Sequence, residues 1–458
     1  MLFHTWAFAA FFAVFYPAYV LAGNTRARLP LLVAASYFFY GCFNPWYVPL
    51  MAYATAVDYL AIWAMSATRW RRTFLAVSIV NNLSLLGVFK YARFACETFA
   101  ALAGAAGLHV PALEPAWMLP VGLSFYTFQS LGYAIDCYRG RVQREANPLR
   151  HAAYVALFPQ LVAGPIVRAA DLLPQLARPP AITAAHLAGG LSLFVTGLFK
   201  KVALADYLAL YVDSVYAAPQ RWSAPALILA TAAFGWQIYF DFSGYSDMAR
   251  GIARAMGIEL MRNFDRPYLA AGLGEFWNRW HISLSTWFRD YVYIPLGGNR
   301  RSWLITHRNM WLTMLLSGLW HGAAWKFALW GAVHAAARSL TRQLERSPRY
   351  VRRVPRAMRC AMVFAVVSVG WVFFRAADAY DALLIVGRIF TGPWADPRFP
   401  LMAGAMIVAV WAFEAMAESR WRSVLERAPV KVVLMAAMII YLALVPGGGV
   451  RPFIYFQF

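Results

Sequence analysis

The stretch "LSGLWHGAAWKFALWG", residues 316–331, is almost wholly apolar, yet it carries His321 near its centre and Lys326 five residues later. Ionisable side chains inside apolar segments are rare and tend to mark functional sites. The alternative is an imidazole that is hydrogen-bonded inside a helix bundle and only packs two helices together. The choice between these two depends on the class of protein, which the composition of the whole chain indicates.

The composition is that of an integral membrane protein. Of the 458 residues, 61% are hydrophobic and 14% are charged, whereas a soluble domain carries about a quarter charged residues. Several separate runs approach the ~20 apolar residues that cross a bilayer. They cover residues 6–22, 48–65, 74–89, 226–240 and 431–445. We therefore predict an all-α polytopic membrane protein that forms one integral unit over residues 1–458.

The net charge of +21 raises the question of nucleic-acid binding. The basic residues, mostly arginine, cluster between the apolar segments, which is typical of short cytoplasmic loops under the positive-inside rule. We therefore expect no nucleic-acid partner, and the lipid bilayer as the surroundings. Alternation of the loops places both termini on the side of the membrane opposite the cytoplasm. The N-terminal run has no basic n-region, so we expect a retained first span rather than a signal peptide.

Two stretches in the middle of the chain break the simple pattern. Residues 151–176 are interrupted by three prolines and a glycine, and broken helices are tolerated where protein buries them or where they line a wet cavity. Residues 274–301 mix arginines with many aromatic rings, which predicts interfacial or re-entrant helices. The four cysteines are scattered, so neither a disulfide framework nor a metal site is expected.

The position of His321 follows from the loop charges. Arginines flank the opening stretch on both sides, so both of its ends are assigned to the cytoplasm. Residues 310–320 make roughly 16 Å of helix, about half of a ~30 Å hydrocarbon core. His321 is therefore predicted near the turning point of a hairpin. Gly318 and Gly322 flank it and permit close backbone approach or a break in the helix.

The residues around His321 favour general-base chemistry. No serine-nucleophile, zinc-protease or phosphate-loop motif accompanies it. An imidazole with a pKa near 6.5 can accept a proton from a hydroxyl during acyl transfer. The same imidazole can serve as a proton relay in a transporter, and the residues alone do not choose between the two.

Five blocks of the chain resemble a known family. They are "LPVGLSFYTFQSLGYAIDCYRG", "FPQLVAGPIVR", "QIYFDFSGYSDMARGIA", "EFWNRWHISLSTWFRDYVYIPLGGNR" and "LSGLWHGAAWKFALWGAVHA". In this order they resemble the membrane-bound O-acyltransferases, closest to the bacterial branch that acetylates polysaccharides such as alginate. The resemblance implies roughly 10–12 transmembrane helices with re-entrant or interfacial helices around a central channel. It also implies that His321 is the catalytic histidine and that His281, 40 residues upstream in "RWHIS", is the second motif residue.

The resemblance implies a reaction as well. An acetyl group would pass from a cytoplasmic donor, acetyl-CoA, across the inner membrane for O-acetylation of an exopolysaccharide such as alginate or cellulose. No bound cofactor is expected, and the partner would be a separate periplasmic acetyltransferase or a polymer-synthesis complex. The alternatives are D-alanyl transfer from a carrier protein to a cell-wall polymer and a proton-coupled transporter. Whether His321 removes a proton or carries the acyl group transiently stays open.

Further residues in these blocks are candidates for substrate binding. Trp320, Asn278 and His281 can donate hydrogen bonds to an oxyanion if they lie near it. Arginines on the cytoplasmic side can bind the phosphates of the donor or simply anchor the chain at the membrane surface. The candidate arginines are Arg279, Arg289, Arg300 and Arg301.

Asp241 and Asp247 are the acidic candidates. Buried carboxylates must be paired or hydrogen-bonded, so a structural network is favoured slightly over direct catalysis. The neighbouring hydroxyls able to serve are those of Tyr239, Ser243 and Tyr245.

The basic residues of the apolar segments have alternative roles. Lys200 and Lys201 can pair with Asp206 or extend to the membrane interface. Lys326 can tune the pKa of His321, and His334, near the cytoplasmic end, is interpreted as a structural residue.

Overall fold

The computed structural model describes residues 1–111, 117–162, 164–178, 181–444 and 451–456. Within these ranges the chain is helical and contains no strand, which confirms the all-α prediction. The contacts divide the chain into two compact units. The first comprises Met1–Leu191 and Ala249–Met261, and the second comprises Ser192–Met248 and Arg262–Phe458. Helices α10 (Ala184–Phe199) and α12 (Ala224–Ala255) have residues in both units.

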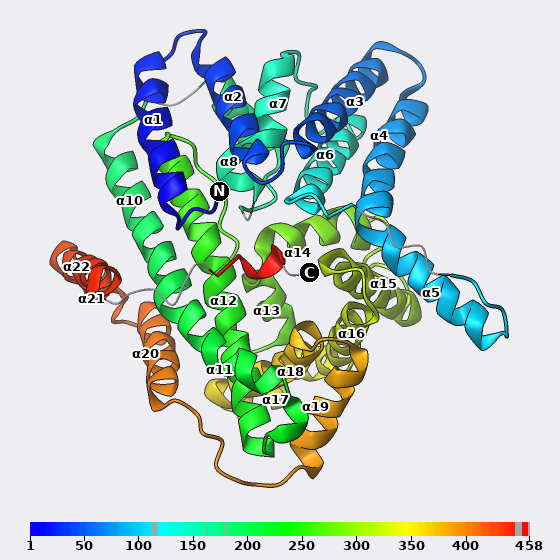
Figure 1. Ribbon diagram of the computed structural model, residues 1–458, viewed down its shortest axis with the longest axis vertical. Coiled ribbons are helices and arrows are strands. Elements are labelled where there is room, and N and C mark those ends of the chain that lie inside the picture. The colour runs from blue at the N-terminus through cyan, green and yellow to red at the C-terminus, as the bar shows by residue number, and fades with distance from the viewer. Residues whose placement is uncertain (112–116, 163, 179–180, 445–450, 457–458) are drawn as a thin grey trace. The chain divides into compact units, whose positions relative to one another are not determined.

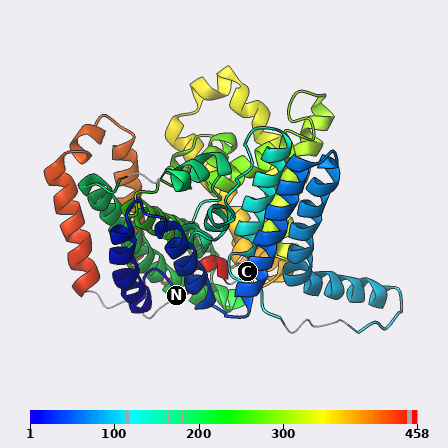
Figure 2. The ribbon, with the colours of Figure 1, turned by 90° about the horizontal axis from the view of Figure 1, so that it is seen from above.

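The first unit is built from the N-terminal helices. Helices α3 (Tyr47–Ala67) and α4 (Arg71–Leu86) run side by side in both views (Figures 1 and 2). The helices of this unit are α1 (Trp6–Ala22), α2 (Arg28–Gly41), α3 (Tyr47–Ala67), α4 (Arg71–Leu86), α5 (Ala92–Ala105), α6 (Leu123–Tyr138), α7 (Pro148–Ala156), α8 (Phe158–Leu161) and α9 (Ala169–Ala177). The short helices α7, α8 and α9 confirm that residues 151–176 form a broken segment.

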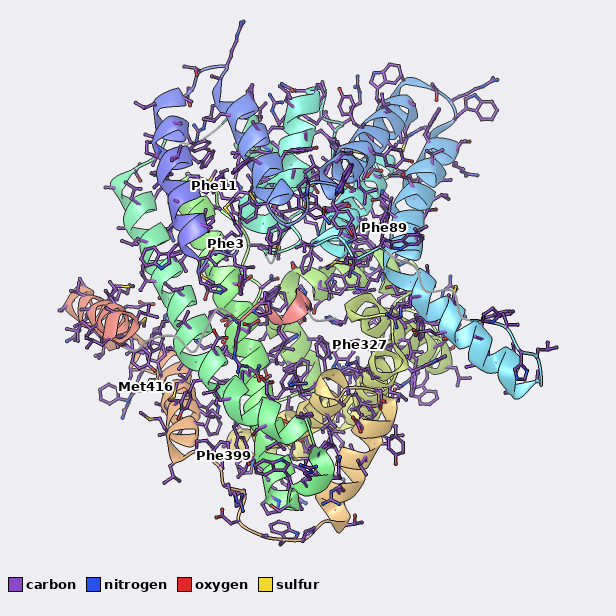
Figure 3. The ribbon with its side chains drawn as sticks, in the orientation of Figure 1. Phe3, Phe11, Phe89, Phe327, Phe399 and Met416 are labelled. Atoms are coloured by element: carbon purple, nitrogen blue, oxygen red, sulfur yellow. The ribbon has the colours of Figure 1, made fainter. Side chains whose placement is uncertain are left out.

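Aromatic rings fill the core of the first unit near α1. The ring of Phe11 lies 5.4 Å from that of Phe158 and the ring of Phe3 lies 5.9 Å from that of Phe39 (Figure 3). Contacts of this kind join α1, α2 and the broken segment, because the large apolar surfaces of the rings pack together away from polar surroundings.

The second unit carries the histidine-containing stretch. Its helices are α11 (Asp206–Tyr216), α13 (Leu273–Arg279), α14 (Ile282–Phe288), α15 (Trp303–His321), α16 (Trp325–Arg346), α17 (Pro348–Arg353), α18 (Arg356–Arg375), α19 (Ala379–Thr391), α20 (Leu401–Ala417), α21 (Arg422–Leu425) and α22 (Ala428–Leu444). Residues 274–301 form α13, α14 and a π-helical turn, so they are not one straight span. Their predicted place at the membrane interface stays a prediction.

Several helices are suited to a bilayer. Among the described residues, four helical stretches are long and apolar enough to cross a membrane. They are Tyr47–Ala67, Arg71–Ala105, Ala184–Tyr216 and Arg356–Arg375, and the shorter apolar helices α1, α20 and α22 accompany them. Helices therefore occur where the sequence predicts spans, and they indicate a chain that crosses the membrane several times. The number of spans, the single-unit prediction and the orientation of the termini stay predictions.

The helical hairpin of α15 and α16 positions the site. Helix α15 ends at His321 and α16 begins at Trp325, which confirms the predicted turning point. A Cβ atom at Gly318 would lie 2.1 Å from the carbonyl oxygen of Phe327, and one at Gly331 would lie 2.5 Å from that of Met314. The two helices thus touch backbone to backbone at Gly318, which is the close approach predicted for the glycines that flank His321.

Candidate active site

His321 is the last residue of α15 and is 4% exposed. Its imidazole lies among aromatic rings, with ring centroids 5.0 Å from Trp320, 5.0 Å from Trp330 and 5.3 Å from Phe374. Gly322, directly after it, leaves room for the ring of Phe327, because a Cβ at Gly322 would lie 2.0 Å from that ring. The hairpin turn therefore fixes the imidazole inside the protein and away from its surface.

His281 lies between α13 and α14, outside the candidate membrane spans, and is 1% exposed. Its ring is nearly perpendicular to that of Phe242, with centroids 4.7 Å apart, and its centroid lies 5.9 Å from that of Trp320. Burial lowers the pKa of His281 to about 3, so its imidazole is uncharged at neutral pH. The centroids of His281 and His321 are 6.4 Å apart. The fold thus brings together the two histidines that the sequence predicts as catalytic.

A cavity of about 470 Å³ lies beside this pair. Its wall includes Ser317, one helical turn before His321, and Ile282, directly after His281. Asn278 and Arg289, both predicted to bind substrate, also line it, and Arg289 pairs with Asp290 at 2.7 Å. The cavity therefore extends to the residues that adjoin both histidines.

Three further arginines line the cavity, and they were not predicted as site residues from the sequence. Arg338, Arg342 and Arg346 follow one another at intervals of four on α16, so their side chains share one face of the helix. Arg338 pairs with Glu345 at 2.7 Å. Within the described ranges, Arg342 and Arg346 have no acidic partner. The spacing of four was the signal in the sequence, but Arg342 and Arg346 were interpreted as part of a cytoplasmic loop and Arg338 was not considered.

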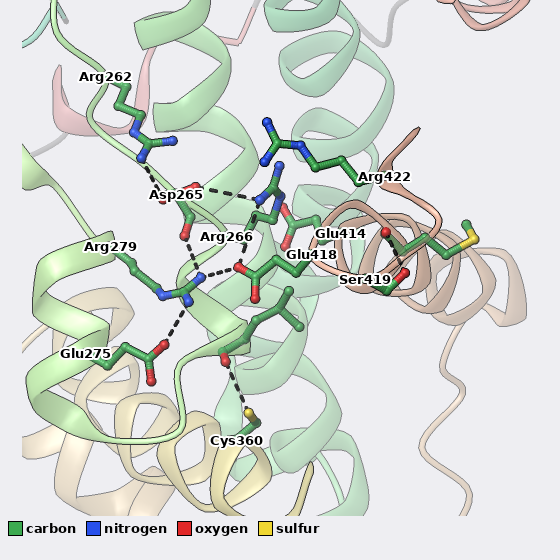
Figure 4. A network of polar contacts seen from close by, with 12 residues as sticks. Arg262, Asp265, Arg266, Glu275, Arg279, Cys360, Glu414, Glu418, Ser419 and Arg422 are labelled. Atoms are coloured by element: carbon green, nitrogen blue, oxygen red, sulfur yellow. Dashed lines mark hydrogen bonds and ion pairs between the residues drawn. The ribbon is translucent and has the colours of Figure 1, made fainter. Parts of the chain in front are cut away.

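Arg279 does not line the cavity. Its guanidinium pairs with Glu275 at 2.7 Å and with Glu418 (Figure 4). The carboxylate of Glu418 also pairs with Arg356 at 3.1 Å. Burial alone would raise the pKa of Glu418, but the hydrogen bonds and charges of the two arginines lower it overall. This cluster joins α13, α18 and the end of α20, so the structure gives Arg279 a structural contact in place of a position in the cavity.

Asp241 and Asp247 are paired with lysines. Asp241 pairs with Lys201 at 2.6 Å, and Asp247 pairs with Lys200 at 2.7 Å. Lys201 also pairs with Asp206 at 2.7 Å, which confirms that part of the sequence interpretation. The hydroxyl of Tyr239, proposed as a partner of the aspartates, donates to Glu414 instead, at 2.6 Å. Both aspartates therefore belong to ion pairs that the hydroxyl-network hypothesis did not include.

The C-terminal segment supplies a neighbour that the sequence analysis did not single out. The ring of Tyr455 lies 5.6 Å from that of His321 and 6.5 Å from that of His281. The adjacent backbone N–H of Ile454 donates to Asp241 at 2.8 Å. The buried pair of Asp241 and Lys201 thus holds the chain segment whose tyrosine packs against both histidines.

Lys326 and His334 complete the set of candidates. The ammonium of Lys326 donates to the carbonyl oxygen of Ala376 at 2.7 Å. His334 is 1% exposed, and its ring lies 4.7 Å from Trp330 and 5.0 Å from Trp277. This packing agrees with the structural role that the sequence analysis favoured for His334.

The sequence of the chain is similar to those of several known proteins. The family model for MBOAT, the membrane-bound O-acyltransferase family, matches residues 137–377. The chain is 41% identical to the probable alginate O-acetylase AlgI of Pseudomonas putida, over 84% of this chain and 79% of that protein. It is 36% identical to a peptidoglycan O-acetyltransferase of Helicobacter pylori, over 78% of this chain and 72% of that protein. It is 27% identical to a teichoic acid D-alanyltransferase of Bacillus subtilis, over 47% of this chain and 57% of that protein.

Proposed function

Because this chain belongs to the membrane-bound O-acyltransferase family, and is therefore a multi-pass membrane O-acyltransferase, we propose that it transfers acetyl groups to a polysaccharide. The donor is acetyl-CoA on the cytoplasmic side, and the acceptor lies beyond the bacterial inner membrane. Both termini face the periplasm, as the loop arginines indicate. The acetyl group continues to the polymer through a separate periplasmic acetyltransferase or a polymer-synthesis complex.

The observation that carries this proposal is the cavity that the arginines of α16 line and that reaches Ile282 and Ser317, next to the histidine pair. Trp330, which contacts His321, lies 8 residues before Arg338 and 12 before Arg342 on the same helix. Those separations correspond to about 12 Å and 18 Å along the helix axis. The pantetheine arm of coenzyme A has about thirteen bonds from phosphorus to sulfur, which extend to about 15 Å. A thioester near His321 therefore places the phosphates beside these arginines.

The chemistry follows from the buried imidazoles. In the proposed step, the Nε2 or Nδ1 atom of His321 accepts the proton of the acceptor hydroxyl, while the oxygen of that hydroxyl attacks the thioester carbonyl carbon. The carbon–sulfur bond breaks, the new ester forms, and the proton leaves on the coenzyme A thiol. The aromatic surroundings exclude water, which would otherwise hydrolyse the thioester. The other route is attack by His321 itself to form an acyl-histidine, and rapid quenching with peptide mass spectrometry distinguishes it.

The names of the relatives support acetyl as the transferred group. The relatives compared above at 41% and 36% identity are named for O-acetylation, and the one named for D-alanyl transfer is 27% identical over about half of the chain. Sequence similarity thus favours acetyl transfer to a polysaccharide over D-alanyl transfer from a carrier protein.

The test measures transfer of radiolabelled acetyl groups from acetyl-CoA to a polysaccharide by membrane vesicles that contain the protein and its periplasmic partner. His321→Ala should abolish transfer at a normal protein level. His307→Ala is the matched control, because His307 lies on the same helix, is 9% exposed and bonds Ser339 outside the histidine pair. Retained transfer by His321→Ala would overturn the mechanism. Transfer from a D-alanyl carrier protein, with none from acetyl-CoA, would replace the proposed donor.

A further inference from the structure

The backbone of His281 lies in the left-handed region, with φ 41° and ψ 55°. Residues other than glycine seldom adopt this conformation, because Cβ crowds the backbone. Such a residue persists where its surroundings hold it, and it is found disproportionately at functional sites. Neighbouring residues must therefore fix this turn of the chain.

Asn263 makes the contacts that hold this turn. Its backbone carbonyl oxygen accepts a hydrogen bond from the N–H of Ile282 at 2.9 Å. Its side-chain Oδ1 accepts from both the N–H and the hydroxyl of Ser283, at 3.3 Å and 2.6 Å. The two residues that follow His281 are thus bonded to one asparagine, which is 1% exposed.

The other end of the Asn263 side chain is fixed as well. Its Nδ2 donates to the hydroxyl of Ser246 on α12 at 3.0 Å. Two residues further along, the N–H of Asp265 donates to the carbonyl oxygen of Arg279 at 2.9 Å, so the chain before His281 is also paired with this segment. The ring of Phe264, between them, stacks on His281 with centroids 6.5 Å apart.

We propose that Asn263 is a positioning residue, which sets the left-handed turn of His281 and so aims its imidazole at His321. This inference rests on the proposed function, in which the two histidines act together. The residue type follows from the contacts. Asparagine offers an acceptor to Ser283 and a donor to Ser246 at once, whereas aspartate lacks the donor and leucine lacks both.

The kinetic test compares Asn263→Ala with Ser246→Ala. Loss of the asparagine side chain removes both of its bonds to Ser283 and leaves only the backbone bond to Ile282. A displacement of about 1 Å in an active site can cost about 100-fold in rate. We expect Asn263→Ala to lower kcat by that order with an unchanged KM for acetyl-CoA, because the arginines of α16 are untouched. Ser246→Ala keeps every bond to the segment after His281, so its kcat should fall by no more than a few-fold.

A matched control separates positioning from folding. Asn82 is also fully buried and bonds Asp58, but it lies in the first unit, outside the histidine pair. Asn82→Ala should lower the melting temperature in detergent and leave kcat per folded protein unchanged. If Asn263→Ala behaves in the same way as Asn82→Ala, the positioning role is overturned.

A readout without acetyl transfer tests the inference when the proposed function fails. Diethyl pyrocarbonate modifies accessible imidazoles, and peptide mass spectrometry measures each histidine. In the wild type His281 should stay unmodified while the exposed His109 reacts. Asn263→Ala should raise modification of His281 several-fold with His109 unchanged. Equal protection of His281 in both proteins overturns the positioning role, whereas absent acetyl transfer by the wild type overturns only the proposed function.

Discussion

Replacement of Gly318 by alanine tests whether the backbone contact of α15 with α16 sets the position of His321. The added Cβ would lie 2.1 Å from the carbonyl oxygen of Phe327, and ordinary contact begins at 3.4 Å, so the helices must separate by about 1.3 Å there. His321 is three residues further along α15 and must move with the helix. A misplacement of about 1 Å can cost about 100-fold in rate, so we expect kcat to fall by about that factor.

The assay is acetyl transfer per folded protein, with the melting temperature in detergent measured in parallel. Overpacking of this kind also destabilises a protein by about 1–3 kcal/mol, so the melting temperature should fall. Gly331 lies on the other helix of the same contact, and a Cβ there would lie 2.5 Å from the carbonyl oxygen of Met314. Gly331→Ala should therefore lower kcat and the melting temperature in a similar way.

The matched control is Gly387→Ala on α19, in the same unit. A Cβ there meets nothing within 4 Å, and alanine favours a helix by about 1 kcal/mol over glycine. This variant should keep full activity and an equal or higher melting temperature. A kcat within two-fold of wild type for Gly318→Ala would refute the reasoning that the glycine contact positions His321.

Three further changes address binding and stability. Arg342→Gln should raise the KM for acetyl-CoA by about tenfold with kcat unchanged, since a hydrogen bond to a charged group contributes about 1.5–3 kcal/mol; the exposed Arg349→Gln should change neither constant. Asp241→Asn removes one partner of the buried Lys201, which costs about 3 kcal/mol, so the melting temperature should fall, and an unchanged value contradicts this. Because the pKa of Glu418 is lowered from its ordinary value of about 4.3, the ionised carboxylate stabilises the folded protein at pH values above about 4.3. The stability advantage of wild type over Glu418→Gln should therefore be lost as the pH falls from about 4.3 through the lowered pKa, and an advantage that persists in stronger acid argues against this.

The sequence predicted the hairpin because the necessary information is local. Apolar residues continue to His321, glycines flank it, and arginines bracket the whole stretch, so its turn follows from segments close together in the chain. The role of His281 came from the resemblance, since a lone histidine among tryptophans has no chemical signature of its own. Its left-handed backbone was beyond prediction, because the bonds to Asn263 join residues about twenty apart.

The arginines that line the cavity show a second reason why the sequence did not predict the whole site. Arg338, Arg342 and Arg346 follow an apolar run, and the positive-inside rule explains such charges as a loop. In the structure α16 continues through Arg346, so the spacing of four becomes a face of a helix. The lysine partners of the aspartates were similarly hidden, because Lys201 and Asp241 are 40 residues apart and meet only in the folded chain.

The distance between the arginines and the histidine pair has a chemical consequence. A general base must be uncharged before it can accept a proton, and a nearby cation disfavours the protonated imidazole that the step creates. Trp330, which contacts His321, is about 12 Å along α16 from Arg338, where the Coulomb energy between unit charges is about a third of that at 4 Å. In the proposed reaction the arginines hold the donor phosphates from that distance, and the aromatic rings keep the immediate surroundings of His321 uncharged. A long thioester donor therefore suits this site, because its phosphates lie beside the arginines while its thioester lies among the aromatic rings. A small acyl phosphate would bring its charge and its reactive carbonyl into the same environment.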